Sequence, residues 1–361
     1  MSEKVRISGA QFAILVIMNV LGTAIIIVPS IAASFGQQNG WFSVLLATLF
    51  GIGLVFLYYL IDNNHPNKNL YEQLEDLFGK WIGKFLSVLF IVFFFEIAIG
   101  NLRVMGDFII TQILVNTPIE VIMLLAVITC LIAVRMGIEV ISRTAEIFFP
   151  YTVIAIILLI TLVLPESEIT HIQPVLQNNI AATLAGVIPL LGYPFLELVV
   201  MLAIMKHVNK QKAGRGFLVG MTIGGLLLTV VTLMCLVVLG SDITARNVYP
   251  TYVLGKKISV ADFLDRIEIL VAIIWFFTIF FKITISFYVV AIGVSHTLNL
   301  KNYKTTTIPL AYVIMVFGFF ASPNIISTRI FLSSTWIPVS LIFGLVIPIV
   351  MLVVGFVKKK I

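Results

Sequence analysis

Charged residues are scarce in this chain. Lys, Arg, Asp and Glu make up only 11% of the 361 residues, whereas hydrophobic residues make up 60% and the mean hydropathy is +1.12. Soluble domains carry about 25% charged residues. A water-soluble globular protein is therefore excluded, and the composition predicts an all-α polytopic membrane protein.

The chain also has only two cysteines and four histidines. Cys130 and Cys235 fall in different hydrophobic runs, which favours packing roles over a disulfide. The histidines show no metal-ligand spacing. The sequence contains no glycine-rich phosphate loop, no Ser/His/Asp arrangement and no polar segment long enough for a soluble domain. We therefore expect no metal, no cofactor and no enzymatic activity.

Hydrophobic runs of about 20 residues are long enough to cross a bilayer as helices. The opening polar stretch, residues 2–8, leads into a run too long for a signal-peptide core, so we expect this run to remain as a helix. The predicted spans cover residues 10–34, 41–61, 84–110, 118–135, 145–164, 182–205, 214–240, 267–296, 306–321 and 335–357.

Lys and Arg are distributed unevenly between the predicted loops. With an even number of spans, the termini and alternate loops share one side of the membrane, and these segments hold most of the Lys and Arg. The other loops have only Arg246, Lys256, Lys257, Arg266 and Arg329. Because positively charged short loops stay in the cytoplasm, both termini are predicted to be cytoplasmic.

Two spans are interrupted by residues that break helices. The first break lies at residues 19–24, with Pro29 beyond it, and the second lies at 188–194. Lipid cannot satisfy the exposed backbone groups of a broken helix, so such breaks are expected to line a cavity. The candidate binding residues here are Gly22, Thr23, Ala24, Tyr193 and Pro194. The alternative is that both are ordinary kinks, since Gly and Pro are frequent in membrane helices.

The breaks open two halves of five spans each. The halves cover about 10–164 and 182–357 of a single transmembrane domain and are joined by an outer segment, 165–181. Because five is odd, the second half enters the membrane in the opposite orientation, which gives an inverted repeat. This organisation matches the LeuT-like amino acid permeases, in which spans 1 and 6 unwind around the substrate. Free N–H and C=O groups at the breaks would suit an amino acid zwitterion, although a sugar or nucleoside could use them too.

The third span carries one polar and one apolar stripe. Glu96, Gly100, Arg103 and Asp107 lie within about 40° on the helix surface. They predict either an ion-pair ladder, with Arg103 and Asp107 at i,i+4, or a hydrated path for protons or ions. The neighbouring apolar stripe would enclose the side chain of a ligand, or would face lipid. Its members are Phe93, Ile97 and Val104, with Asn101 at the edge.

Lys282 lies in the middle of the eighth span, far from any other charge in that span. It cannot readily extend to water, so it needs a partner inside the protein. One interpretation is that it holds a ligand carboxylate or replaces a coupling sodium ion. The other is a structural ion pair with Glu197 or Glu96. We expect Glu197, three residues past Pro194, to be structural.

Several short segments resemble the permease-like B subunits of bacterial spore germinant receptors. They are 22–29 (GTAIIIVP), Gly40 and Trp41, 77–83 (LFGKWIG), 135–143 (RMGIEVISR), Phe149 and Pro150, and 174–176 (PVL). These proteins belong to the amino acid/polyamine/organocation permease superfamily. The resemblance implies a LeuT-like subunit in the spore inner membrane that senses a small-molecule germinant and assembles with an A subunit and a lipoprotein C subunit.

The resemblance also implies a ligand pocket. Carried over residue by residue, it falls at Gly22, Phe93, Ile97, Tyr193, Pro194, Lys282 and Ser286. The chain departs from the family at Lys282, where a neutral hydroxyl residue is expected. Three functions stay open: a nutrient sensor, a coupled amino acid permease and an ion-conducting subunit. A charged Lys282 would repel a cation, which disfavours sodium coupling more than proton coupling.

Overall fold

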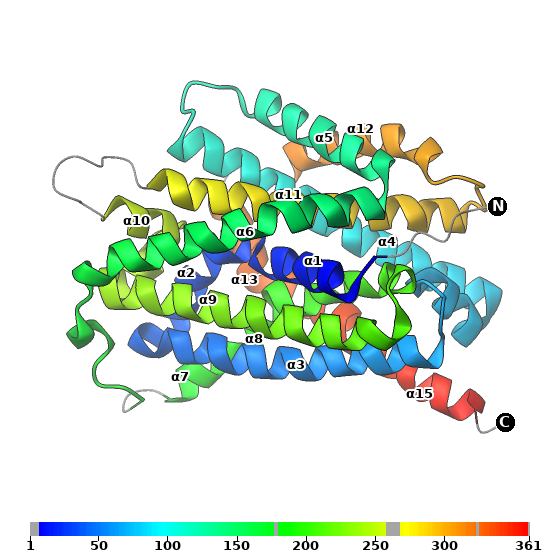
Figure 1. The fold of residues 1–361 in the computed structure, drawn as a ribbon, viewed down its shortest axis with the longest axis horizontal. Helices are drawn as coiled ribbons and strands as arrows, with labels where there is room; N and C mark the ends of the chain where they lie inside the picture. Colours follow the sequence, from blue (N-terminus) through cyan, green and yellow to red (C-terminus); the bar gives the residue numbers. More distant parts are fainter. Residues whose placement is uncertain (1–6, 177–179, 258–267, 323–324, 360–361) are drawn as a thin grey trace.

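The computed structural model describes residues 7–176, 180–257, 268–322 and 325–359 (Figure 1). Within these ranges, eight helical segments are long and apolar enough to cross a membrane, and Gly9–Leu21 and Lys304–Phe320 are shorter apolar helices. The helices run along one common direction (Figure 1), with α7 and α10 at one end of the bundle and the last turns of α15 at the other. The prediction of an all-α membrane protein is confirmed.

The first half contains the first broken span and four further long helices. Ser8 begins α1 with a capping box, because its side chain accepts from the backbone of Gln11 while Gln11 accepts from the backbone of Ser8. Gly22 and Thr23 then separate α1 from α2. The elements are α1 Gly9–Leu21, α2 Ala24–Gly36, η1 Gln37–Asn39, α3 Gly40–Asn64, α4 Leu70–Gln112, α5 Ile119–Met136 and α6 Ile138–Val163.

The second half contains the second break. The 165–181 connection carries two short helical turns, η2 Leu164–Glu166 and η3 Ile169–Ile172. Helical geometry fails at Tyr193, with φ −145° and ψ 107°. The elements are α7 Ile180–Ala185, α8 Val187–Leu190, η4 Leu191–Phe195, η5 Leu196–Ala203, η6 Met205–His207, α9 Lys210–Arg246, α10 Pro250–Lys256, α11 Glu268–Thr297, α12 Lys304–Phe320, α13 Ile325–Ser334, α14 Trp336–Leu341, η7 Ile342–Val346 and α15 Ile347–Lys359.

Small residues let α1 pack closely against α9. Gly216, Gly220 and Gly224 recur every four residues on one face of α9. A Cβ atom at Gly220 would lie 2.6 Å from the carbonyl oxygen of Ala13, and one at Gly216 would lie 2.5 Å from that of Gly9. No larger side chain fits there, so this glycine face fixes the position of α1 at the centre of the bundle.

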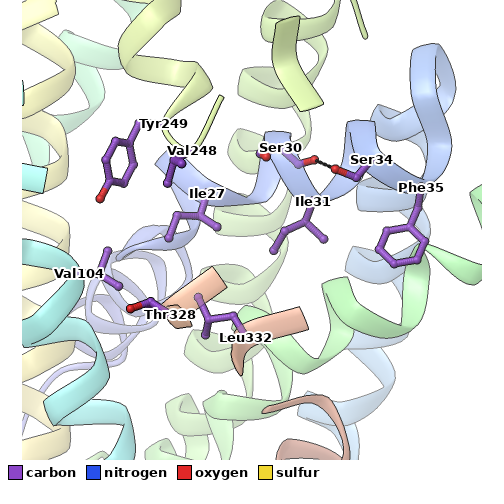
Figure 2. Close-up of a pocket in the computed structure, with 10 residues that line it drawn as sticks. All are labelled: Ile27, Ser30, Ile31, Ser34, Phe35, Val104, Val248, Tyr249, Thr328 and Leu332. Atoms are coloured by element: carbon purple, nitrogen blue, oxygen red, sulfur yellow. Dashed lines mark hydrogen bonds between the residues drawn. The ribbon is translucent and has the colours of Figure 1, made fainter. Parts of the chain in front are cut away.

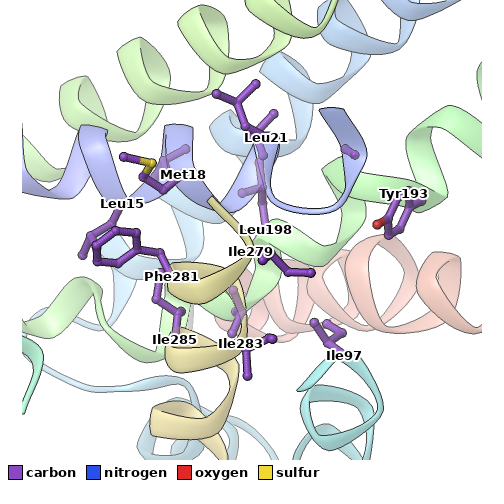
Figure 3. Packing of buried hydrophobic residues seen from close by; sticks show 14 of the residues in the cluster. Leu15, Met18, Leu21, Ile97, Tyr193, Leu198, Ile279, Phe281, Ile283 and Ile285 are labelled. Carbon is purple, nitrogen blue, oxygen red and sulfur yellow. The ribbon is translucent and has the colours of Figure 1, made fainter. Parts of the chain in front are cut away.

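The other side of α1 packs against α11 through apolar side chains. Figure 3 shows Leu15 and Met18 of α1 beside Phe281 and Ile285 of α11, and all four are buried. Helix α11 also packs along α4. The first break, the middle of α11 and the middle of α4 are therefore neighbours, and the site is built where they meet.

Candidate functional site

The first break lies directly against α11. The N–H of Gly22 still donates to the carbonyl of Met18 at 2.9 Å, which completes the last turn of α1. The carbonyl of Gly22 accepts a hydrogen bond of 3.2 Å from the Thr278 hydroxyl. A side chain supplied by α11 thus satisfies a backbone group that the break frees.

Lys282 fills the space beside Gly22. A Cβ atom added at Gly22 would overlap the Cδ atom of Lys282 and would lie 3.3 Å from its Cβ atom. The missing side chain of Gly22 therefore leaves room for the stem of Lys282. The role of Gly22 in ligand binding stays a prediction. In this structure the space beside Gly22 holds the stem of Lys282.

The ammonium group of Lys282 is paired with Glu197. The Nζ atom lies 2.7 Å from Oε2 of Glu197, and the two side chains are only 0% and 2% exposed. The same ammonium lies 4.6 Å from the centre of the Tyr193 ring, within the range of a cation–π contact. Trp336 donates from Nε1 to the other oxygen of Glu197 at 2.9 Å. The sequence suggested either Glu197 or Glu96 as an ion-pair partner of Lys282, and in the structure the partner is Glu197.

A chain of hydrogen bonds joins the first break to α4. Thr23, in the first break, donates from its hydroxyl to Oδ1 of Asn101, and the amide of Asn101 donates to the carbonyl of Ile97 at 2.6 Å. The side chain of Thr23 also interacts with that of Tyr193, in the second break. Thr23 is fully buried and Tyr193 is 4% exposed. Movement at either break would therefore disturb the other and α4 as well.

A cavity of about 50 Å³ lies beside this chain of hydrogen bonds, and we call it the central cavity. It is several times larger than the space that one water molecule needs. Two carboxylates, three aromatic rings and several aliphatic side chains form its wall. The lining residues are Glu96, Ile97, Gly100, Asn101, Val104, Tyr193, Glu197, Thr328, Phe331, Leu332 and Trp336.

The structure places the predicted site residues in three positions. Ile97, Asn101 and Tyr193 line the central cavity, as do Glu96 and Glu197 of the predicted charge network. Phe93 and Lys282 lie behind the wall: Phe93 stacks on Trp336 at 5.3 Å between ring centres, and Lys282 contacts Glu197. The remaining predictions, Gly22, Thr23, Ala24, Pro194 and Ser286, are not among the lining residues.

The polar stripe of α4 divides into two parts. Arg103 and Asp107 form the i,i+4 ion pair at 3.1 Å, and Arg103 also donates to the carbonyl of Phe319 at 2.8 Å. Glu96 and Gly100 belong instead to the wall of the central cavity. The ladder interpretation thus holds for one half of the stripe only.

The sequence did not point to α13 and α14 as part of the wall. Thr328, Phe331 and Leu332 lie on α13, in a segment that was predicted to be the loop between the last two spans. Trp336 lies at the start of α14. A ten-residue helix gives no membrane-span signal, so only the short apolar run of Ile330–Leu332 could have pointed to it.

A second cavity, which we call the end cavity, continues from the central one toward the end of the bundle that carries α10. It has a volume of about 80 Å³ and shares Val104, Thr328 and Leu332 with the central cavity. Figure 2 shows its wall, with Ile27 and Ile31 of α2 above Thr328 and Leu332 of α13, and with Tyr249 at the left.

Comparison with known families decides the identity. A family model described as spore germination protein matches residues 6–326. This chain belongs to the spore germination protein family. Spore germination protein KB of Bacillus subtilis (strain 168) is 30% identical over 364 residues, which cover 99% of this chain and 96% of that protein. Spore germination protein YndE of the same organism is 25% identical over 86% of each chain. The family resemblance noted in the sequence is confirmed.

Solved structures confirm the fold of this spore germination protein. Mhp1, a nucleobase-cation-symport-1 family transporter solved in a closed conformation with bromovinylhydantoin bound, superposes with a TM-score of 0.64 at 15% identity, over 94% of this chain and 78% of Mhp1. MhsT in complex with L-phenylalanine superposes with a TM-score of 0.63 at 16% identity, over 96% and 97%. The architecture is the LeuT-like inverted repeat, in which the first and sixth membrane spans are broken.

Proposed function

We propose that this chain is the nutrient-sensing subunit of a spore germinant receptor. A small nutrient, in the first instance an amino acid, binds in the central cavity. The observation that carries the proposal is that residues of the second break, α4, α13 and α14 line a cavity of about 50 Å³. The first break reaches the wall of this cavity through the hydrogen bond from Thr23 to Asn101. Membership of the spore germination protein family supplies the physiological setting.

Binding has to change the balance between two conformations if it is to signal. A ligand shifts such a balance only when its affinity differs between the two states. Thr23 of the first break contacts two residues of the cavity wall: it donates a hydrogen bond to Asn101 and interacts with Tyr193. A ligand held between these groups would move the two breaks relative to α4, and partner subunits would sense that movement.

The setting of the receptor is part of the same proposal. Both termini lie in the cytoplasm, so the end cavity opens to the outside of the spore inner membrane and admits the nutrient. The partners are an A subunit and a lipoprotein C subunit. The distribution of Lys and Arg and the family membership support this arrangement.

A second candidate function is a proton-coupled amino acid permease. It is favoured by the buried ion pair of Lys282 and Glu197, because ionisable groups inside a membrane domain mark ion and proton pathways in transporters. The likeness to two transporters in overall fold is compatible with this candidate.

The two candidates separate in one experiment on purified protein. Thermal unfolding across a panel of amino acids, nucleosides and sugars identifies a ligand, because a ligand at 100 times its dissociation constant adds about 2.7 kcal/mol of stability. The same ligand, radiolabelled, is then offered to proteoliposomes with and without a proton gradient. Binding without uptake supports the sensor, and gradient-driven uptake supports the permease. The absence of stabilisation by every compound would contradict both.

A further inference from the structure

The charges around the central cavity do not balance. Its wall contains two carboxylates, Glu96 and Glu197. Glu197 is neutralised by Lys282 and receives a further hydrogen bond from Trp336. Glu96 forms no ion pair or hydrogen bond with any described residue. Because a lone carboxylate inside a membrane domain is costly, a carboxylate at this place favours a cationic group in the cavity.

The other polar groups of the wall are already engaged. The Asn101 amide accepts from Thr23 and donates to Ile97, and the Tyr193 side chain interacts with Thr23 and lies against the Lys282 ammonium. Thr328 also has an interaction partner. Lys282 does not line the cavity, and its ammonium is already paired with Glu197. Among the described wall residues, the uncommitted polar group is the carboxylate of Glu96.

Space for a ligand lies one helical turn from Glu96. A Cβ atom added at Gly100 would have no heavy atom within 4 Å, and Gly100 lines the same cavity. Since residues i and i+4 lie on one face of a helix, the Glu96 carboxylate and the open space at Gly100 are adjacent. A small molecule in that space would come within reach of the carboxylate.

Aromatic rings complete the surroundings of this space. Phe331 and Trp336 line the cavity with their ring centres 6.1 Å apart, and Trp336 is held in place by stacking on Phe93. Aromatic faces attract organic cations, and tryptophan does so most strongly. A bare metal ion is matched less well, because ions such as Ca²⁺ take six to eight oxygen ligands.

We propose that Glu96 is the residue that selects the ligand, and that the central cavity takes a small molecule bearing an ammonium group. The ammonium pairs with Glu96 beside Gly100, while the rest of the molecule contacts the rings of Phe331 and Trp336. This inference rests on the proposed function, because it names the chemical class of the nutrient bound at the same site.

The test uses matched pairs of compounds on the purified full-length protein in nanodiscs. L-Alanine is compared with L-lactate, and propylamine with propanol, so that each pair differs in the ammonium group. Binding is measured by competition and by thermal unfolding. The amine of at least one pair binds at least tenfold more tightly than its hydroxyl counterpart. In Glu96→Gln, the preference for the amine falls by about 10- to 100-fold, because the variant loses one charge-assisted hydrogen bond to the ammonium group.

Three variants and one salt series show which part of the proposal is wrong if the expected result is not obtained. Gly100→Leu fills the cavity and abolishes binding, whereas Gly53→Leu, whose position also has no heavy atom within 4 Å but lies outside the cavity, does not. Equal binding of amine and hydroxyl compounds overturns the ammonium class. An unchanged preference in Glu96→Gln overturns the role of Glu96 as the selecting residue. Both outcomes leave the sensor proposal intact. Binding that is indifferent to Gly100→Leu overturns the proposed site itself. Glu96-dependent stabilisation by NaCl or KCl, without any amine, overturns the organic ligand in favour of an inorganic cation.

Discussion

The ammonium of Lys282 lies 2.7 Å from the carboxylate of Glu197, and neither side chain is more than 2% exposed. One partner comes from the middle of α11 and the other from the segment just after the second break. The stem of Lys282 passes the glycine of the first break on its way to Glu197. A single ion pair therefore spans both breaks, and its removal should affect folding and binding together.

Lys282→Met should destabilise the protein strongly. The substitution keeps the length of the stem that packs beside Gly22 but leaves the Glu197 carboxylate buried without a counter-charge. Removing one partner of a buried ion pair costs about 3–5 kcal/mol. The measurement is the unfolding midpoint in detergent.

The matched control is Lys206→Met. Lys206 pairs with Glu72 at 3.3 Å, but the two side chains are 23% and 36% exposed, so the cost should be about 0–1 kcal/mol. The double variant Lys282→Met with Glu197→Gln should recover part of the lost stability, because it removes the orphaned charge. Equal effects of Lys282→Met and Lys206→Met would show that the buried pair has no special role.

Thr23→Val should weaken the connection between the first break and α4. Valine has nearly the shape of threonine but cannot donate to Asn101, so the buried Oδ1 atom of Asn101 loses its partner. The expected cost is about 1–3 kcal/mol. Thr129→Val is the control, because Thr129 is exposed and donates only within its own helix, and its effect should stay within about 0.5 kcal/mol. If the two variants unfold at the same temperature, the Thr23 connection is energetically unimportant.

Gly220→Val should disturb the packing of α1 on α9. The added Cβ would lie 2.6 Å from the Ala13 carbonyl oxygen, so the helices would have to separate. Overpacking of this kind costs about 1–3 kcal/mol. Gly53→Val, at a helical glycine with open space around it, should cost less than about 1 kcal/mol. The yield of monodisperse protein and its unfolding temperature give the comparison, and equal values for both variants would contradict the packing account.

The features of the fold that arise from local sequence were predictable. The break at Gly22 and Thr23 follows from a glycine inside a hydrophobic run, and the pairing of Arg103 with Asp107 follows from their i,i+4 spacing. The partner of Lys282 could be narrowed to two carboxylates, but the choice between them depends on how the segment after the second break is rotated. That rotation is a property of packing, so the sequence could not provide it.

The wall of the site was only partly predictable. The residues on α4 lie at helical spacing and were found as stripes, but which stripe faces a cavity depends on the neighbours of α4. Glu96 therefore looked like a member of an ion-pair ladder, although it forms no such pair with a described residue. Helix α13 closes the cavity as a short segment packed beside α4. The role of α13 depends on tertiary contacts, and a segment of ten residues is too short to show a hydrophobic periodicity in the sequence.

The central claim is that a nutrient occupies the space beside Gly100 and enters through the end cavity. The measurement is the rate at which Gly100→Cys reacts with a charged methanethiosulfonate reagent added from outside to sealed proteoliposomes of known orientation. The ligand found by thermal unfolding, at 100 times its dissociation constant, leaves about 1% of sites free. The account predicts that it slows labelling of Gly100→Cys roughly 100-fold, while labelling of Ser34→Cys, in the exposed wall of the end cavity, is unchanged. Labelling of Gly100→Cys at the same rate with and without the ligand would contradict the account.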